Sequence, residues 1–371
     1  MGADTGWAVS NLPSIEELLS AAVQSGASDL HLKAGLPPVL RVNGRLQASR
    51  LNPLGEPEVA AFLADMIPEH LRVEFKETNE ADFSFGGNNG GGRFRVNAFR
   101  QRGLVSVAVR ILAEPDKSFD ELGLPPVLDR MVEESRGLIL VTGPTGSGKS
   151  TTLAAIVDVI NTRRKTNIIT IEDPIEVIHR DKLSMIHQRE VGADTATFAE
   201  ALRRVLRQDP DVILIGEMRD VATIDAALKA AETGHLVLST LHTLDATETI
   251  NRILDFFPAG LQRQIRLLLA ASLKGIISQR LIPRADTAGR IPAVEVLVNT
   301  ERVAERIIDP ATTHEIPDVI AEGVYHGMET FDQCILRLFA AGRVTVEEAL
   351  RHATKPADLK LCAQQQGLIG T

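Results

Sequence analysis

The chain has 371 residues, 44% of them hydrophobic, and a formal net charge of −9, which is typical of a globular protein with two or three domains. The acidic balance argues against a general nucleic-acid binder. The sequence has no run of 18 apolar residues that could span a membrane and no secretory signal pattern at its start, and its two cysteines, Cys334 and Cys362, are too few for a cysteine zinc site.

The first 114 residues predict an α+β domain. A capping box formed by Ser14 and Glu17 starts an amphipathic helix over residues 14–25. The pattern then predicts a strand over 28–33, a hairpin over 39–46 that turns at Asn43-Gly44, a helix over 56–66, and an antiparallel meander over 81–85, 93–102 and 104–112. Residues 115–120 are polar and contain proline, and we expect them to be a linker.

Residues 121–371 predict an α/β domain, because strand and helix patterns alternate and imply a mainly parallel sheet covered by helices. The expected strands are 137–142, 167–172, 184–191, 212–215 and 235–240, and the expected helices are 150–161, 197–208 and 221–232. From about residue 261 the pattern is mostly helical and begins with one long amphipathic helix over 261–277.

A glycine-rich segment between the first strand and helix of this domain fits the phosphate-binding P-loop pattern G-x-x-x-x-G-K-[ST]. Its glycines allow backbone N–H groups to surround phosphate oxygens at a helix N-terminus. Lys149 would reach the β- and γ-phosphates of ATP, and the Ser150 hydroxyl would hold Mg²⁺. The alternative is a chance match. The predicted nucleotide-binding residues are Gly143, Pro144, Thr145, Gly146, Ser147, Gly148, Lys149, Ser150 and Thr151.

Two acidic segments follow at the ends of predicted strands, where parallel sheets bind their ligands. Glu172 and Asp173 could position a water molecule or the hydration shell of Mg²⁺. Glu217 ends an apolar strand and is the candidate general base, while Gly216 stands where many P-loop enzymes carry an aspartate. The alternative for each acid is an ordinary strand-terminal residue in solvent.

A third segment places one histidine at each end of a short strand. His235 and His242 suit contacts to phosphate or coupling to a neighbouring subunit. The alternative is that each is a packing residue.

In this order and spacing, the four segments resemble the Walker A, Asp box, Walker B and His box of the secretion-type ATPases that drive type IV pili and type II secretion. Gly216 follows that family's own pattern, and residues 27–32 and 92–99 resemble its PAS-like N-terminal domain. The resemblance implies a PAS-like domain over 1–114, a linker over 115–120, and a RecA-like P-loop domain over 121–371 with a helical C-terminal part from about 261.

Within the family, the chain looks most like the PilT-type retraction ATPases. It begins directly at the PAS-like domain, lacks the four-cysteine zinc insertion of other members, and resembles the retraction group over residues 327–334. One segment departs from that group: residues 313–323 lose both basic residues that retraction ATPases often carry there. An accessory retraction paralogue therefore stays open beside the main motor.

The resemblance also implies how the site is completed and what it drives. Arg95 and Arg110 would bring positive charge from the PAS-like domain to the γ-phosphate, as an arginine finger does, unless they are surface arginines paired with local acids. The implied catalytic set is Glu217, Glu172, Lys149, Arg95, Arg110 and His242.

The implied assembly is a cytoplasmic homohexameric motor. It would work at the inner face of the cytoplasmic membrane, turn an inner-membrane platform protein, touch the membrane only through partners and bind no nucleic acid. Pilus extension, type II secretion and nucleic-acid translocation stay as alternative functions.

Overall fold

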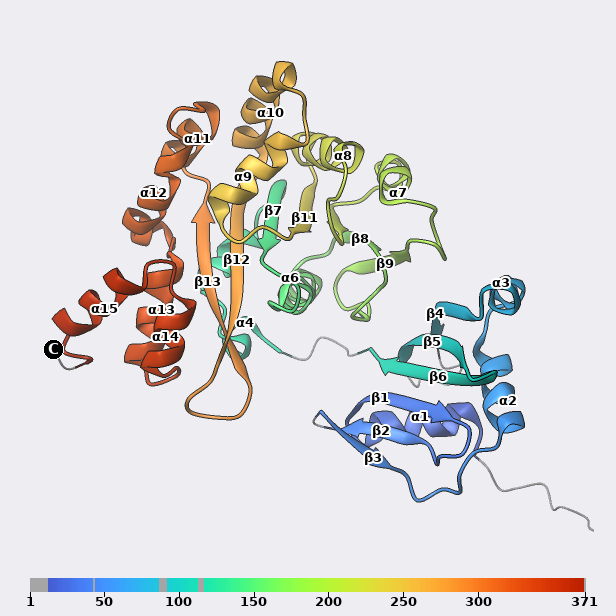
Figure 1. Cartoon of the computed structure of the whole chain (residues 1–371). Helices are drawn as coiled ribbons and strands as arrows, with labels where there is room; N and C mark the ends of the chain where they lie inside the picture. Colours follow the sequence, from blue (N-terminus) through green and yellow to red (C-terminus); the bar gives the residue numbers. More distant parts are fainter. Residues whose placement is uncertain (1–12, 43, 87–91, 113–116, 370–371) are drawn as a thin grey trace, which may run out of the picture. The chain divides into compact units, whose positions relative to one another are not determined.

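The computed structural model describes residues 13–369 except residues 43, 87–91 and 113–116, and Figure 1 labels its helices and strands. The chain divides into two compact units, residues 1–114 and residues 115–371. No helix among the described residues has the length and apolar character needed to cross a membrane.

The first unit is a six-stranded sheet with helices, ordered β3-β2-β1-β6-β5-β4, in which neighbouring strands are antiparallel. The elements are α1 (Ile15–Gln24), β1 (Ala27–Lys33), β2 (Val39–Val42), β3 (Arg45–Ala48), α2 (Glu56–Met66), α3 (Leu71–Thr78), β4 (Glu80–Gly86), β5 (Arg93–Gln101) and β6 (Leu104–Ile111). The predicted helices, hairpin and meander are confirmed, and α3 was not predicted. The predicted turn residue Asn43 lies outside the described residues.

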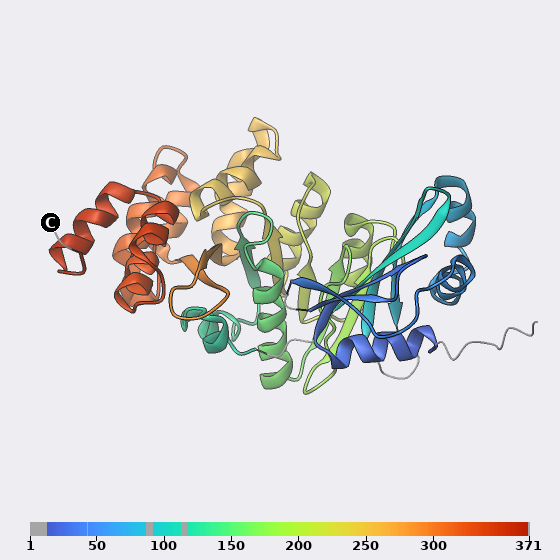
Figure 2. The same ribbon diagram turned by 60° about the horizontal axis from the view of Figure 1, so that its bottom comes forward.

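Alternation along these strands gives the first sheet two different faces. Leu30, Val96 and Val109 point into a core with residues of α1 and α2, and α1 crosses this face of the sheet in Figure 2. On the other face, Arg95 and Arg110 are exposed and face each other directly across β5 and β6. This face therefore presents two cations side by side.

The second unit is built around a seven-stranded sheet ordered β13-β12-β7-β11-β10-β8-β9. Its strands are parallel except for the antiparallel pair β12–β13. The strands are β7 (Gly137–Thr142), β8 (Asn167–Glu172), β9 (Met185–Glu190), β10 (Val212–Ile215), β11 (Leu236–Leu241), β12 (Leu273–Pro283) and β13 (Arg290–Val298).

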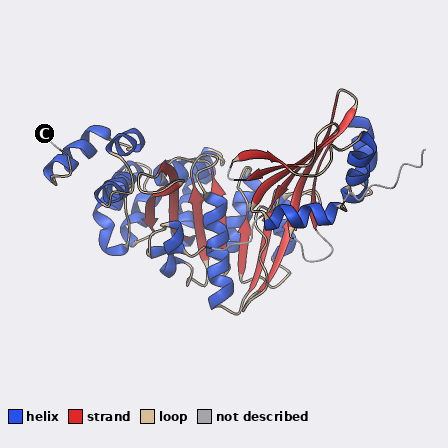
Figure 3. Cartoon of the chain, turned by 90° about the horizontal axis from the view of Figure 1, so that it is seen from below, coloured by secondary structure: helices blue, strands red, loops and turns tan. Residues whose placement is uncertain are grey.

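Helices cover both faces of this sheet, as Figure 3 shows. The fully buried strand β7 contributes Leu138 and Leu140 to one core and Ile139 and Val141 to the other, because its side chains alternate between the faces. The first core holds α7 (Phe198–Val205), α8 (Val221–Glu232), α9 (Ala246–Asp255), α10 (Ala259–Ser272), α11 (Glu301–Ile308) and α12 (Ile316–Glu322). The second holds α4 (Phe119–Leu122), α5 (Val127–Met131), α6 (Lys149–Arg163), α13 (Phe331–Ala340), α14 (Val346–His352) and α15 (Pro356–Gln365).

The prediction of one helix over residues 261–277 is wrong beyond Ser272. The chain leaves α10 there and enters β12, which pairs in parallel with β7 and carries the buried β-branched residues Ile276 and Ile277. A short apolar run does not reveal by periodicity whether it is a buried strand or a buried helix, and here sheet pairing decides. The predicted linker also differs at its end, because α4 begins at Phe119.

Candidate functional site

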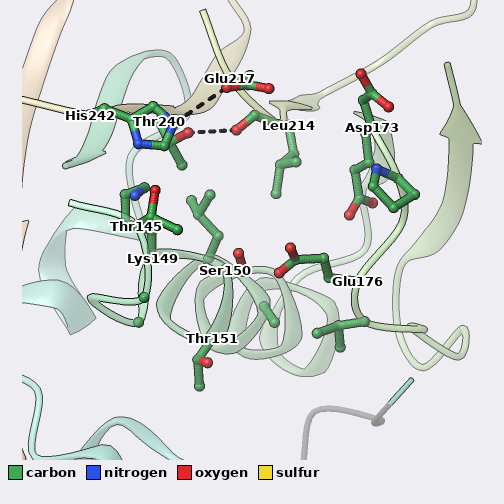
Figure 4. Close-up of a pocket in the computed structure, with 18 of the residues that line it drawn as sticks. Thr145, Lys149, Ser150, Thr151, Asp173, Glu176, Leu214, Glu217, Thr240 and His242 are labelled. Atoms are coloured by element: carbon green, nitrogen blue, oxygen red, sulfur yellow. Dashed lines mark hydrogen bonds and ion pairs between the residues drawn. The ribbon is translucent and has the colours of Figure 1, made fainter. Parts of the chain in front are cut away.

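The P-loop connects the end of β7 to the start of α6. The Nζ of Lys149 donates hydrogen bonds to the carbonyl oxygens of Gly143 at 2.8 Å and Pro144 at 3.1 Å, so the ammonium group lies over the loop. Ser150 and Thr151 follow at the exposed start of α6 (Figure 4). The loop thus presents a buried cation, exposed hydroxyls and a helix N-terminus together, which suits a phosphate group.

Gly143 is fixed by close contact with the neighbouring strand. Its φ is +140°, and a Cβ atom there would lie 2.4 Å from the carbonyl oxygen of Gln279 and 2.7 Å from the Ser147 hydroxyl. Gln279 belongs to β12 and donates from its side-chain amide to Thr152 of α6 at 2.8 Å. The loop is therefore seated directly against β12, with no room for a side chain.

We expect Gly143→Ala to lower the free energy of unfolding by about 2–4 kcal/mol, because the new methyl group must push the loop off β12 in a backbone conformation that alanine disfavours. Chemical unfolding and ADP titration measure the two effects, and ADP binding should weaken as well. Gly146→Ala is the matched control, since Gly146 has a φ of +79° with nothing within 4 Å of its Cβ position. Equal losses in both variants would mean that the contact with Gln279 is unimportant.

The P-loop, the ends of β8, β10 and β11, and residues of β12 and β13 line one pocket of about 600 Å³. The predicted residues that line it are Thr145, Gly146, Gly148, Lys149, Ser150, Thr151, Glu172, Asp173, Glu217 and His242. The structure thus brings together predicted residues that are up to 97 positions apart in the sequence, from Thr145 to His242. Gly143, Pro144 and Ser147 belong to the loop but do not line the pocket.

Glu172 is held at the end of β8 by two hydrogen bonds. Its Oε1 accepts from the Thr170 hydroxyl at 2.6 Å and from the Gln188 side-chain amide at 3.1 Å. Burial raises the pKa of this carboxyl, while the two hydrogen bonds act in the opposite direction. Glu172 is therefore a positioned carboxyl that lines the pocket.

Glu217 follows β10 and is held by two neighbouring side chains. Its side chain is only 12% exposed, and its two oxygens lie 2.5 Å from Nη2 of Arg219 and 3.5 Å from Nε2 of His242. Figure 4 shows His242 reaching toward Glu217. Two side chains from separate segments therefore fix the carboxylate, as a general base requires.

Gly216 sits where the aspartate of many P-loop enzymes would be. Its N–H donates to the Ile171 carbonyl oxygen at 2.8 Å, and its own carbonyl accepts from the Thr240 hydroxyl at 2.7 Å. A Cβ at this position would lie 3.3 Å from the Ile171 oxygen and 3.4 Å from Cα of Glu172. The small residue lets the ends of β8, β10 and β11 approach closely.

Both burial and nearby carboxylates shift the pKa of the Lys149 amino group. Burial lowers its pKa, and the carboxylates of Glu217 and Glu176 partly restore it. The pocket thus sets one buried cation against a group of acids.

The oxygen donors of the pocket fit a Mg²⁺ ion that is held mainly by a nucleotide. Ser150 offers an exposed hydroxyl, and Glu172, Asp173 and Glu217 line the same space. Hydroxyl and carboxylate oxygens suit Mg²⁺, which usually keeps several water ligands. Among the described residues no group of three or more His, Cys, Asp or Glu is placed to hold a metal ion.

The structure does not bring His235 to the pocket. His235 precedes β11 at the opposite end from His242, roughly 20 Å away at the rise of a strand. Its Nδ1 lies 3.0 Å from the Ala230 carbonyl oxygen at the end of α8. Within this unit its imidazole contacts the end of α8 and does not line the pocket, and contact with phosphate or with another subunit stays a prediction.

Arg95 and Arg110 belong to the first unit. The Nε of Arg110 donates to Oδ1 of Asp29 at 3.1 Å, and the guanidinium helps to lower the pKa of that carboxyl against the effect of its partial burial. Three neighbouring strands therefore carry Asp29, Arg110 and Arg95 in one row. The ion pair with a local acid exists for Arg110, and contact with a nucleotide stays a prediction.

Several residues that line the pocket were not predicted from the sequence: Glu176, His179, Phe198, Arg219, Leu281 and Arg290. Burial lowers the pKa of His179 to about 4, so its imidazole is neutral at physiological pH. Its Nδ1 has no hydrogen-bond partner among the described residues. Arg219 could have been predicted as a pocket residue, since it follows Glu217 by two positions. Leu281 and Arg290 could not, because they come from the strand pair in the region predicted as mostly helical.

Comparison with known proteins agrees with this geometry. A model of the family "Type II/IV secretion system protein" matches residues 9–360. Among curated proteins of Pseudomonas aeruginosa, the type IV pilus retractation ATPase PilT is 45% identical, over 92% of this chain and 98% of its own length. The type IV pilus ATPase PilU is 42% identical, over 93% and 90%.

Among solved structures, the crystal structure of the pilus retraction motor PilT with bound ADP superimposes with a TM-score of 0.85 at 43% identity. The match covers 94% of this chain and 100% of that one. The likeness therefore extends over both units and includes the RecA-like P-loop domain. The chain belongs to the Type II/IV secretion system protein family and, within it, to the PilT-type ATPases.

Proposed function

We propose that this chain is the ATP-hydrolysing motor that powers retraction of a type IV pilus. The observation that carries the proposal is the single pocket that joins the P-loop to Glu172, Glu217 and His242 in a chain 45% identical to a pilus retraction ATPase. The product of such a motor is mechanical work, drawn from the hydrolysis of ATP to ADP and phosphate.

The pocket residues divide the chemical work. The P-loop amides and Lys149 bind the β- and γ-phosphates, and Glu217 accepts a proton from the water that attacks the γ-phosphorus. Glu172 orients that water or the hydration shell of the metal. A Mg²⁺ ion bound to the Ser150 hydroxyl and the phosphates would neutralise charge on the transferred group.

The assembly we propose is a homohexamer at the inner face of the cytoplasmic membrane. Arg95 and Arg110 would complete the phosphate site from the PAS-like domain, so that loss of the γ-phosphate releases one unit from the other. The partner would be an inner-membrane pilus platform protein, with membrane association only through that partner and with no nucleic acid as ligand. The row of cations on the first sheet supports this role for the arginines.

A second candidate, an accessory motor subunit of the same pilus, is favoured by one surface. Residues 313–323 form the 3₁₀ turn Thr313–Glu315 and α12, with Ile316 and Val319 buried. The exposed side chains of this segment include Asp318 and Glu322 but no lysine or arginine. The retraction group typically carries basic residues here, so a different contact of this helix with its partner is expected.

Deletion of the gene in the source organism tests the proposal, with surface pili and pilus pulling force as the measurements. A main retraction motor predicts excess pili that do not retract, because subunits are no longer removed from the base. Normal pilus numbers with reduced pulling force would favour the accessory subunit instead. Bald cells would contradict both, since they indicate an extension motor. Wild-type protein without any ATP turnover would contradict the enzymatic assignment itself.

A further inference from the structure

The two ends of the pocket differ in chemistry. The strand β7, which carries the P-loop, lies between β11 on one side and β12 on the other. The acids and His242 all follow strands on the β11 side, whereas Leu281 and Arg290 line the pocket from β12 and β13. One end is therefore acidic and suited to hydrolysis, and the other combines an apolar side chain with a cation.

The position of the catalytic base sets the orientation of a nucleotide bound to this P-loop. Its γ-phosphate must lie near Glu217, because the attacking water needs a base. With the phosphates along the P-loop, the remainder of the molecule extends away from Glu217, toward β12. Leu281 is already in place there, since its Cδ2 lies 3.8 Å from the Cβ position of Gly148.

Arg290 stands at the end of this path and is available for a ligand. It is the first residue of β13, paired with Pro283 of β12, and its side chain is exposed. The nearby carboxylate of Asp286 is taken by Arg284, at 2.6 and 2.8 Å, and by Arg343 at 2.6 Å. Among the described residues, no hydrogen bond or ion pair engages the side chain of Arg290.

The hairpin that carries Arg290 is anchored. The Arg284 amide donates to the Gly289 carbonyl oxygen at 3.1 Å, and the Ala285 amide donates to the Arg343 carbonyl oxygen at 2.8 Å. The first bond closes the β12–β13 connection on itself, and the second joins it to the turn after α13. A guanidinium on such a support can offer a flat cationic face in a defined place.

We propose that Arg290 stacks on the nucleobase of the bound nucleotide and, with Leu281, forms the base-binding end of the site. A guanidinium plane attracts an aromatic ring through cation–π and stacking interactions, and an aliphatic side chain supplies an apolar contact. The proposal rests on the proposed function, namely that the P-loop binds ATP. It assigns to the β12–β13 hairpin the part of the affinity that distinguishes a nucleotide from free phosphate.

The test compares ADP with pyrophosphate as ligands in isothermal titration of the full-length protein. Arg290→Ala should weaken ADP binding about 3- to 30-fold and leave pyrophosphate binding unchanged within about 2-fold, because pyrophosphate lacks the base. Arg290→Lys should weaken ADP binding nearly as much as Arg290→Ala does, since lysine keeps the positive charge but lacks the planar guanidinium group. Arg351→Ala is the matched control, because it also removes one exposed arginine, which does not line the pocket. Arg351 has only a distant ion-pair partner among the described residues, Glu348 at 3.8 Å.

Each other outcome overturns the proposal. Equal weakening of ADP and pyrophosphate would make Arg290 a phosphate ligand, and no weakening of ADP would remove it from the site. Full ADP affinity in Arg290→Lys would show that charge alone matters. Failure of the proposed function is distinguishable, because the wild-type protein would then bind neither ligand.

Discussion

Replacing Glu217 by glutamine is expected to lower the rate of ATP turnover by about 10²- to 10⁴-fold, the usual contribution of a general base. Glutamine keeps the size of the side chain and still accepts a hydrogen bond from Arg219, but it cannot take a proton from water. Glu217 is 12% exposed, and its contacts with Arg219 and His242 hold its carboxylate in place. ATP binding should persist, because the P-loop is untouched.

Glu176→Gln is the matched control for this experiment, since it removes one carboxylate from the same pocket. Its turnover should stay within a few-fold of wild type if Glu217 is the base. Steady-state phosphate release gives the rate, and titration with a non-hydrolysable ATP analogue gives the affinity. Wild-type turnover in Glu217→Gln, or an equal fall in Glu176→Gln, would show that the proton goes elsewhere.

Sequence patterns predicted the residues of this pocket that follow strands. The P-loop, Glu172, Glu217 and His242 could be found because each comes directly after an apolar run, and the carboxyl ends of parallel strands meet at one edge of a sheet. The same logic fails for His235, which precedes its strand and therefore lies at the opposite edge. Which end of a strand a residue occupies thus carries functional information.

The part of the pocket formed by β12 and β13 could not be predicted from the sequence, because it depends on which strands pair in the sheet. Residues 273–283 combine apolar and polar side chains in a way that suits a helix or a strand, and only their pairing with β7 makes them a strand. Once that strand was missed, Leu281 and Arg290 could not be placed beside the P-loop. The hydrogen bonds of Gln188 and Thr170 to Glu172 are likewise contacts that no local pattern encodes.

A second large effect is expected at Glu295, a buried carboxyl of β13 that is 8% exposed. Its Oε1 accepts from the Ala246 amide at the start of α9 at 2.9 Å. Burial raises its pKa to about 7, helped by Asp245 and Asp332, while the Ala246 bond and Arg280 oppose the shift. The site therefore favours the neutral form of Glu295.

The sign of the pH dependence follows from this raised pKa. A carboxyl whose folded pKa lies above its ordinary value of 4.5 contributes stability below pH 4.5 and loses it as the pH rises through 7. The difference between the two pKa values corresponds to about 3 kcal/mol. Glu295→Gln cannot ionise and still accepts the Ala246 bond, so it should escape this loss.

Chemical unfolding of nucleotide-free protein between pH 5 and pH 8.5, at one protein concentration, measures the effect. The stability of Glu295→Gln relative to wild type should rise by up to about 3 kcal/mol across this range. Glu347→Gln, at an exposed glutamate of α14, is the control and should show a difference that does not change with pH. A constant difference for Glu295→Gln as well would mean that Glu295 ionises without cost, and that water reaches the junction between β13 and α9.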